Sequence, residues 1–344
     1  MDLEIIDPTE FPHWDELLLS IPEATIFHTS SWARVLKDSY GYCPVYFTGI
    51  EKAQISFLLP IMEINSFITG KRGVSLPFTD YCRVICPQDA TLIDILGPVI
   101  EYGKKARWNY LEIRDGRHLI PGGLTYYSYV GHMLDLTRGT EMVYSDFRDS
   151  TKRNIKKAAR EGIRIHIEQS KTAIDQFYGL NCMTRKEHGL PPQPRSFFTK
   201  IYEHIISQNR GFIVLGSFKE RVIASAVFFH YGGNCIYKYG ASDKNFHRLR
   251  TGNLIIWEAI KHFCREGLKS ICFGRTELGN KGLRQFKGGW GAEETQIQYF
   301  KYNLRQGVFV SGKQKGKPAY TGLFRAIPPP ILNIIGSLLY RHMG

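Results

Sequence analysis

The sequence lacks a long apolar run, a signal peptide and the short motifs of several common catalytic sites. No part of its 344 residues reaches the roughly 20 consecutive apolar residues that a membrane-spanning helix needs. The acidic start, MDLEIIDPTE, has no basic segment followed by an apolar run. No P-loop, HExxH motif or Ser/His/Asp set is visible. We therefore expect a cytoplasmic protein without a metal site.

Cysteine is also scarce. Seven cysteines, an odd number, are scattered along the chain, and most have apolar neighbours. This pattern is typical of reduced thiols in the core of a cytosolic protein. Only Cys82 and Cys86 lie close together, and no second pair of cysteines or histidines accompanies them. Their spacing is therefore a poor indication of zinc.

Positive charge is abundant, but only in the second part of the chain. Residues 1–140 contain 12 Lys+Arg and 17 Asp+Glu, whereas residues 141–344 contain 33 and 15. The net charges are therefore −5 and +18. This asymmetry favours contact between the second part and a polyanion such as tRNA, a nucleotide, a pyrophosphate-linked lipid or an anionic membrane. The alternative is that the charge serves solubility alone.

Two segments, 44–114 and 211–274, repeat one order of elements although they share little identity. In each, two apolar runs flank a short turn and lead through a loop to a helical pattern and a further strand. This order predicts a duplicated α/β unit. The predicted strands are 44–50, 53–64, 108–114, 211–218, 222–231, 233–242 and 269–274, and the predicted helices are 91–106 and 253–267.

A basic segment, DFRDSTKRNIKKAAREG, lies between the two repeats. Its apolar residues recur at helical spacing, and Gly162 is a natural C-cap, so we predict a connecting helix. The opposite face is either only solvated or in contact with phosphates. That face carries Arg153, Lys156, Lys157 and Arg160. The predicted divisions are a domain at 1–140, a link at 141–165, a domain at 166–305 and a tail at 306–344.

The start of the helix predicted at 253–267 is suited to an anionic ligand. Free N–H groups and the helix dipole favour negative charge there. In the GNAT acyltransferase superfamily this position binds acyl-CoA, usually through a Gln/Arg-x-x-Gly-x-Gly/Ala loop. Here Gly252 fits that loop, but Leu249 and Leu254 stand at other key positions. The sequence therefore predicts an anion site with a degenerate CoA loop.

Five segments, TRKEHGLPPQP, YKYGASD, LIIWEAI, FGRT and QFKGGWG, follow one another at characteristic separations. In this order they resemble the FemA/FemB/FemX-type aminoacyltransferases, especially the FemAB-like branch found with bacterial surface-polysaccharide systems. The similarity extends from about Phe27 to Tyr302 and is strongest after Ile236. The resemblance implies an α/β (α+β) fold with two tandem GNAT-like domains.

The same resemblance implies an acyltransferase of cell-envelope or surface-polysaccharide biosynthesis. An acceptor amine would attack an activated carbonyl and form an amide. The donor would be aminoacyl-tRNA or acyl-CoA, the acceptor would be an amine-bearing envelope precursor, and no cofactor would be tightly bound. Two other functions stay open, namely an acyl-CoA-dependent N-acetyltransferase and a catalytically silent scaffold or nucleic-acid-binding protein.

The resemblance also assigns catalytic roles to a Phe-Lys pair, matched here by Phe286 and Lys287. It implies that Lys287 stabilises the oxyanion at the transferring carbonyl and that Phe286 holds Lys287 by packing. Both lie in GRTELGNKGLRQFKGGWGAEE, residues 274–294, whose six glycines predict a flexible loop. The alternative is a surface hairpin whose lysines are only solvated.

Three candidate substrate-binding residues come from the resemblance. The PFTDY segment assigns contact with the acceptor to Asp80 and, more weakly, to Tyr81. Arg195 follows the prolines of a segment where the family binds substrate. Upstream, SSWARVLKDSY resembles a family segment, but the acceptor-binding lysine of some members falls at Leu36, one position before Lys37.

Four more candidates lie in the second repeat or directly after it. Tyr237 and Tyr239 alternate along a predicted strand, so we expect both rings on one face, either at the substrate or in ordinary packing. Asn253 either binds substrate or caps the following helix. Arg275 stands at a strand end and binds either a substrate phosphate or carboxylate, or a neighbouring acid.

The tail joins a basic linker to the short apolar stretch PILNIIGSLLY. This stretch is too short to cross a bilayer. It either lies on an anionic membrane surface, with nearby basic residues meeting the lipid, or docks on the body of the protein and completes a groove.

Overall fold

The computed structural model describes residues 3–87, 92–115, 120, 124–312 and 321–344. The chain forms two compact units, each made of separate segments. Unit 1 consists of Met1–Tyr129, Gln296–Gly316 and Leu338–Gly344, and unit 2 consists of Val130–Thr295 and Lys317–Ser337.

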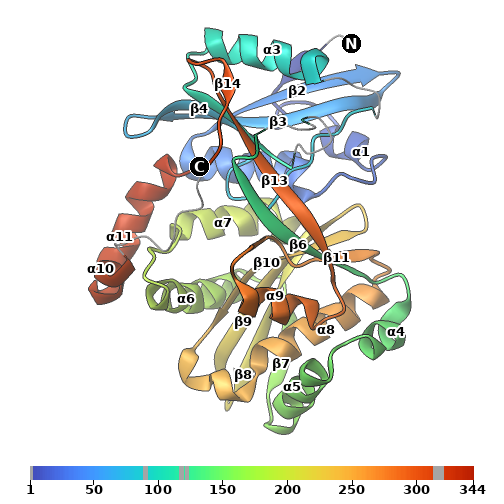
Figure 1. The fold of residues 1–344 in the computed structure, drawn as a ribbon. Helices are drawn as coiled ribbons and strands as arrows, with labels where there is room; N and C mark the ends of the chain where they lie inside the picture. Colours follow the sequence, from blue (N-terminus) through green and yellow to red (C-terminus); the bar gives the residue numbers. More distant parts are fainter. Residues whose placement is uncertain (1–2, 88–91, 116–119, 121–123, 313–320) are drawn as a thin grey trace. The chain divides into compact units, whose positions relative to one another are not determined.

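Unit 1 is a mixed sheet packed against helices (Figure 1). Its elements are β1 (Glu4–Ile6), α1 (Trp14–Leu18), α2 (Ser30–Tyr40), β2 (Cys43–Glu51), β3 (Gln54–Ser66), β4 (Gly70–Val74), α3 (Leu92–Lys105), β5 (Tyr110–Arg114), most of β13 (Glu293–Asn303) and β14 (Val308–Phe309). The strands follow the order β1-β2-β3-β4-β5-β13. The pair β4-β5 is parallel because α3 makes the crossover between them, and Trp108 and Phe300 belong to its apolar core.

The strands of unit 2 are also mixed parallel and antiparallel, in the order β7-β8-β9-β10-β11-β6. Its strands are most of β6 (Tyr127–Asp135), β7 (Arg164–Glu168), β8 (Gly211–Phe218), β9 (Arg221–Tyr231), β10 (Asn234–Ser242), β11 (Ser270–Cys272) and β12 (Thr276–Glu277). Its helices are α4 (Gly139–Ser145), α5 (Asp149–Arg160), α6 (Lys171–Glu187), α7 (Arg195–His204), α8 (Thr251–Arg265), α9 (Lys281–Gly288), α10 (Thr321–Ala326) and most of α11 (Pro329–Leu339).

The two units repeat one topology, which confirms the predicted α/β class with a duplicated unit. In unit 1 the antiparallel strands β2-β3-β4 lead through α3 to the parallel strand β5. In unit 2 the strands β8-β9-β10 lead through α8 to β11 in the same way. The short strand β4 was not predicted, because its sequence GKRGV lacks a clear apolar alternation. Gly73 is needed there, since a Cβ atom would lie 2.3 Å from the ring of Trp108.

The units are not the consecutive segments that the sequence analysis expects. Helix α5 packs against α8, and its Ile155 and Ala158 belong to the core of unit 2, so α5 is more than a link between domains. Residues 296–316, expected to close the second domain and begin the tail, belong to unit 1 instead. Strand pairing explains this difference, because β13 is hydrogen-bonded to β5.

A β-bulge in β10 overturns the expectation that Tyr237 and Tyr239 share a face. Tyr237 pairs with Phe228 and Tyr239 with Val227, so the extra residue reverses the alternation. Tyr237 therefore packs with the core that contains α8. Tyr239 instead contacts Phe198 of α7, with ring centroids 5.5 Å apart.

The tail packs against the body and also leaves an apolar surface exposed. Gly336 of α11 fits closely against Pro192, where a Cβ atom would lie 2.1 Å from the carbonyl oxygen. Leu332 is buried on the same helix, whereas Ile331 and Ile334 are exposed. Within unit 1, Arg72 donates a hydrogen bond of 2.8 Å to the carbonyl oxygen of His342. Among the described residues, no helix combines the length and the apolar character that crossing a bilayer requires.

Candidate functional site

Lys287 lies on a helix and not on the flexible loop that the sequence predicts. Residues Lys281–Gly288 form α9, and the side chain of Asn280 caps this helix by accepting a hydrogen bond of 3.1 Å from the N–H group of Leu283. Apart from Gly274, the glycines that suggested a loop lie near the two ends of the helix and at its second position. The cap and the packing described below thus outweigh the poor helix propensity of glycine.

The ammonium group of Lys287 is held inside unit 2. The residue is only 5% exposed, and its Nζ atom donates hydrogen bonds of 3.0 Å and 3.1 Å to the carbonyl oxygens of Gly274 and Arg275. Those carbonyls follow β11, where Gly274 adopts a left-handed φ of 69°. The two acceptors fix the direction of the ammonium group at the end of the strand.

Trp290 anchors the end of α9 in the core. It is fully buried and contacts Phe147 and Phe273, with ring centroids 5.1 Å and 6.4 Å away. Phe286 is 37% exposed and packs edge-on against Trp290 at 6.2 Å. The packing expected of Phe286 is therefore directed at Trp290.

An ionisable side chain that the sequence did not reveal, His132, lies beside Lys287. His132 on β6 is fully buried, and its Nε2 atom lies 3.3 Å from Oε1 of Glu294. Arg284 holds Glu294 with two bonds, of 3.0 Å and 2.6 Å, which lower the pKa of the carboxyl. Burial lowers the pKa of His132, and the charge of Lys287 lowers it further. His132 is consequently neutral near pH 7, and it stands in an unremarkable strand with no motif around it.

A cavity of about 320 Å³ opens between β9, β10 and the first turn of α8. Ser225 and Thr251 are buried in its wall, and neither hydroxyl has a hydrogen-bond partner within the described part of the chain. Such orphaned hydroxyls indicate a place where a ligand or water completes the bonding. The cavity is lined by Thr184, Ile223, Ala224, Ser225, Ala226, Tyr237, Gly240, Ala241, Ser242, Asp243, Phe246, His247, Arg250, Thr251, Gly252, Asn253 and Ile255.

Two predicted residues, Tyr237 and Asn253, line this cavity. Burial raises the pKa of Tyr237 to about 12, so its phenol is a neutral group near pH 7. Asn253 is not the helix cap, because Arg250 occupies that position without a side-chain hydrogen bond. The first turn of α8 therefore faces the cavity without a side-chain cap.

Phe273 links the cavity to Lys287. Its ring centroid lies 6.3 Å from that of Tyr237, and the next residue, Gly274, accepts a hydrogen bond from Lys287. Two other predicted residues lie apart from the cavity lining. Tyr239 is on the face of α6 and α7, and Arg195 is paired with Asp175 through a bond of 2.8 Å from Nη2. Arg275 contributes its carbonyl to the site.

Asp80 and Tyr81 lie in a strained loop of unit 1. Leu76 and Phe78 have left-handed φ angles of 54° and 60°, which are uncommon for residues with large side chains. The hydroxyl of Tyr299 donates a bond of 2.5 Å to the carbonyl oxygen of Asp80. The loop is therefore held by a strand that comes more than 200 residues later. Strained loops of this kind are frequent at functional sites.

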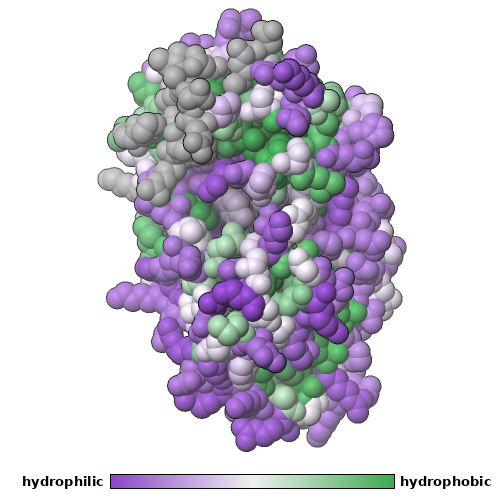
Figure 2. Space-filling model, turned by 90° about the vertical axis from the view of Figure 1, so that its right-hand side faces the viewer, coloured by the Kyte–Doolittle hydropathy of each residue, from purple (hydrophilic) through white to green (hydrophobic). Residues whose placement is uncertain are grey.

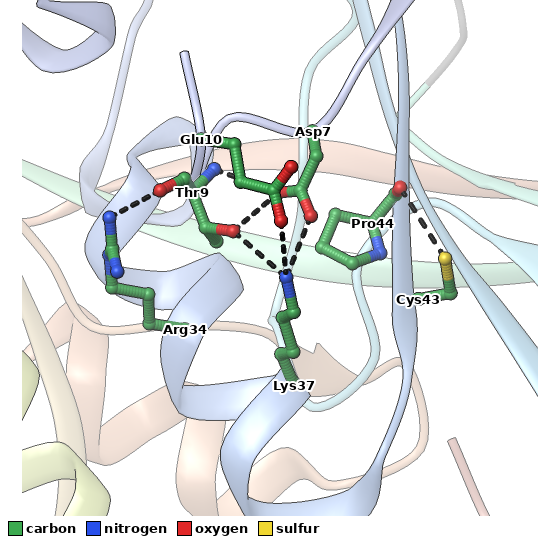
Figure 3. Close-up of polar contacts among 7 residues, drawn as sticks. All are labelled: Asp7, Thr9, Glu10, Arg34, Lys37, Cys43 and Pro44. Carbon is green, nitrogen blue, oxygen red and sulfur yellow. Dashed lines mark hydrogen bonds and ion pairs between the residues drawn. The ribbon is translucent and has the colours of Figure 1, made fainter. Parts of the chain in front are cut away.

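Leu36 cannot serve as the acceptor-binding lysine, and the ammonium group of Lys37, one position later, is engaged by acidic side chains. Leu36 is fully buried, and Figure 3 shows the ammonium group of Lys37 among the side chains of Asp7, Thr9 and Glu10. Its Nζ atom lies 2.9 Å from Oδ2 of Asp7 and 3.4 Å from Oε1 of Glu10. The hydrogen bond with Asp7 raises the pKa of Lys37. This lysine thus ties the N-terminal segment to α2.

Within the described residues, no group of three or more His, Cys, Asp and Glu side chains has the geometry to hold a metal ion. Cys82 is fully buried, and desolvation raises the pKa of its thiol. Cys86 is half-buried, and burial raises its thiol pKa as well. Both thiols are therefore protonated near neutral pH and poorly suited to metal binding.

The chain resembles known acyltransferases in sequence and in fold. Residues 145–288 match the acetyltransferase (GNAT) domain family. A UDP-N-acetylmuramoylpentapeptide-lysine N(6)-alanyltransferase of Weissella viridescens is 19% identical over 263 residues, which cover 71% of this chain and 78% of the relative. FemX superposes with a TM-score of 0.67 at 12% identity, covering 87% of this chain and 97% of that chain.

Two further solved structures share the fold. L-PGS from Bacillus licheniformis gives a TM-score of 0.54 at 12% identity and covers 92% of this chain and 96% of its own. A tandem GNAT protein from the clavulanic acid biosynthesis pathway gives a TM-score of 0.55 at 9% identity. The match covers 88% of this chain and 99% of that chain. The duplicated units and the matched domain show two GNAT-type domains, in a fold similar to that of FemX.

Proposed function

We propose that this protein is an acyltransferase that joins an acceptor amine to an activated acyl group in cell-envelope or surface-polysaccharide biosynthesis. The buried ammonium group of Lys287 is the observation that carries the proposal. A fixed positive charge in a water-poor site stabilises a developing oxyanion far more than one in bulk water. The relatives named above supply the reaction class.

In the proposed reaction the amine nitrogen attacks the carbonyl carbon of an ester or thioester. A C–N bond forms as the carbonyl oxygen becomes negative beside Lys287. The C–O or C–S bond to the donor then breaks, and the proton lost by the nitrogen is taken up by the leaving oxygen or sulfur. Lys287 acts through its charge and its fixed position, which the carbonyls of Gly274 and Arg275 maintain.

We assign the donor of the acyl group to the cavity of unit 2. Its unpartnered hydroxyls, Ser225 and Thr251, and the uncapped start of α8 favour polar and anionic groups there. Tyr237 and Asn253 are the predicted residues that would touch the donor. Both an aminoacyl-tRNA and an acyl-CoA carry an activated carbonyl and phosphate groups in one molecule, so either donor suits these features.

The acceptor is assigned to unit 1, through Asp80 and Tyr81. A carboxylate on a rigid loop can orient a positively charged or hydrogen-bonding acceptor. The alanyltransferase relative acts, by its name, on the lysine of a UDP-N-acetylmuramoylpentapeptide. An amine-bearing envelope precursor is the corresponding acceptor class for this chain.

We also propose peripheral contact between α11 and an anionic membrane. Ile331, Ile334 and Leu338 are exposed at helical spacing, and Arg325 and Arg341 flank the helix. An apolar stripe with basic neighbours is typical of helices that lie in a membrane surface. The buried face of α11, with Leu332 and Gly336, keeps this helix attached to the protein.

Replacing Lys287 tests the proposed function. Purified protein is incubated with charged tRNA or with acyl-CoA, together with envelope precursors, and the mass gained by the acceptor is followed. Lys287→Ala should lower kcat/KM by about 100-fold, the usual effect of losing one oxyanion contact. Lys281→Ala, an exposed change on the same helix, should leave the rate unchanged. If a folded Lys287→Ala protein turned over substrate at the wild-type rate, the proposal would be refuted.

A further inference from the structure

We propose that the turn between β3 and β4 inserts into an anionic membrane surface. Phe67 and Ile68 lie at the end of this turn, and we call them the hairpin tip. Phe67 is 89% exposed and Ile68 is 57% exposed, whereas the lower part of Figure 2, on the side where Figure 1 places α4 and α5, is mainly hydrophilic. The hairpin tip comes from another part of the chain than α11, so this contact is separate from the one proposed for that helix. It also does not depend on the transfer reaction.

The hairpin, residues 64–74, extends beyond its neighbouring strands. Strand β2 pairs with β3 only as far as Glu63, and β5 pairs with β4 only from Arg72 onward. Strands β3 and β4 continue to pair with each other as far as Ser66 and Gly70. In Figure 1 the turn projects from the sheet of unit 1, next to the label β4. The turn therefore holds the hairpin tip away from the core of the unit.

The turn needs no bulky apolar residue for its own geometry. It is a three-residue connection followed by Gly70, whose φ is 79°, and this is a common way to close a hairpin. Space also requires Gly70, because a Cβ atom there would lie 2.0 Å from Nδ2 of Asn109. Turns otherwise favour Gly, Asn, Asp and Ser. Two adjacent exposed apolar side chains, Phe67 and Ile68, therefore indicate contact with an apolar phase outside the protein.

The hairpin tip is held in place before any membrane is met. Oγ of Ser66 accepts hydrogen bonds of 3.2 Å and 3.0 Å from the N–H groups of Ile68 and Thr69. The same oxygen lies 2.9 Å from Nδ1 of His342. The ring of Phe67 stands edge-on to His342, with ring centroids 4.6 Å apart. Because the turn is already ordered, inserting it loses less conformational entropy than inserting a flexible loop.

Positive charge accompanies the hairpin tip. The hairpin and the segment 338–344 together contain three basic residues and no acidic one, although the N-terminal part of the chain is acidic. Lys71 pairs with Glu63, just outside the hairpin. Arg341 directly precedes His342, is exposed and has no acidic partner among the described residues. This cation can therefore attract lipid phosphates while the hairpin tip is inserted.

A membrane suits the hairpin tip better than a protein partner does. A stable protein interface buries about 800 Å² on each side. Phe67 can bury about 250 Å² at most, and Ile68 is a smaller side chain. The exposed Met343, next to His342, adds one more apolar group. A bilayer can surround a protruding tip on all sides, so a few apolar side chains with a basic neighbour are enough for contact.

A tryptophan placed at the hairpin tip tests this inference. Phosphatidylglycerol vesicles with bromine on their acyl chains quench a tryptophan that enters the apolar layer. Four of the five native tryptophans, Trp14, Trp32, Trp108 and Trp290, are buried, so the background is small. At saturating lipid, Phe67→Trp should show clear additional quenching relative to the wild type. The absence of additional quenching would overturn the inference.

Sedimentation with phosphatidylglycerol vesicles provides a second measurement. Changing Phe67 and Ile68 together to Ser should reduce binding at least about tenfold, because two apolar side chains no longer enter the lipid. The matched control changes Ile5 and Leu19 to Ser, which are also exposed in unit 1, at 48% and 60%. The control should bind like the wild type. Equal losses in the two variants would refute a specific role of the hairpin tip.

Two other results would also overturn the inference. Unchanged sedimentation of the Phe67→Ser, Ile68→Ser variant would assign all membrane contact to α11. In analytical ultracentrifugation without vesicles, a wild-type dimer that this variant cannot form would assign the hairpin tip to a second copy of the chain. Lys287→Ala should bind vesicles like the wild type, so a failure of the proposed function and a failure of this inference are distinguishable.

Discussion

The hydroxyl of Tyr237 occupies the space where Gly240 would otherwise carry a side chain, because a Cβ atom there would lie 1.8 Å from that oxygen. Gly240 and Tyr237 both line the cavity of unit 2. The absence of a side chain at position 240 thus sets the position of the phenol. This relationship can be tested directly.

Gly240→Ala should push the ring of Tyr237 out of place and raise the KM for the donor, by about tenfold if one well-placed contact worth about 1.4 kcal/mol is lost. Steady-state kinetics with varied donor concentration measure this effect. Gly179→Ala is the control, since α6 leaves open space at that position and alanine favours a helix. An unchanged KM in Gly240→Ala would remove Tyr237 from the donor site.

Protonation of His132 should lower the rate of the reaction in acidic solution. Its pKa is lowered below the usual 6.5, so the ring is neutral near pH 7 and gains a proton only in more acidic solution. A charged ring beside Lys287 would repel the ammonium group, although it would also attract the carboxylate of Glu294. We expect kcat/KM to fall below about pH 6.5, and His132→Gln to lose part of this dependence. Identical profiles from pH 5 to 8 would exclude the role.

His28 should make the fold sensitive to acid. Its Nδ1 atom accepts a bond of 3.1 Å from the N–H group of Thr25, and its Nε2 atom donates one of 2.9 Å to the carbonyl oxygen of Arg83. This pattern requires a neutral ring, and burial lowers the pKa of His28. The unfolded chain binds this proton more readily, so stability is complete above about pH 6.5 and decreases as the pH falls.

The free energy of unfolding measures this effect, with a slope of at most about 1.4 kcal/mol per pH unit from one group. Urea titrations between pH 7.5 and 5 should show a smaller slope for His28→Gln than for the wild type. The exposed His13→Gln is the control, and it should keep the wild-type slope.

The apolar stripe of α11 should bind anionic vesicles. Changing Ile331, Ile334 and Leu338 to Ser removes the stripe but leaves the buried Leu332 and Gly336 in place. Burying these three exposed side chains in lipid is worth several kcal/mol in total, so sedimentation with phosphatidylglycerol vesicles should fall at least tenfold. Equal sedimentation of the variant and the wild type would contradict membrane contact.

Local patterns were enough to predict the long elements. The helix expected at 253–267 is observed at Thr251–Arg265, and the one expected at 91–106 is observed at Leu92–Lys105. Both have strong apolar periodicity and a basic last turn, so neighbouring residues alone specify them. The duplicated order of elements followed from these patterns.

The features that could not be predicted from the sequence depend on contacts between residues that are far apart in the chain. The glycine-rich segment becomes α9 because Trp290 is buried against Phe147 and Phe273, which come from other parts of the chain. The bulge in β10 cannot be derived from alternating residues, since it depends on the pairing with β9. His132 is brought to Lys287 by sheet pairing between β6 and β11, and no motif marks it. Part of the candidate site is therefore a property of the tertiary fold.

Because β13 completes the sheet of unit 1 from residues near the end of the chain, synthesis on the ribosome leaves the edge of β5 unpaired until about residue 303 has emerged. An open strand edge invites pairing with other chains. A protein shortened before β13 should therefore aggregate, and no single cut of the chain can release the two units as independent folding domains.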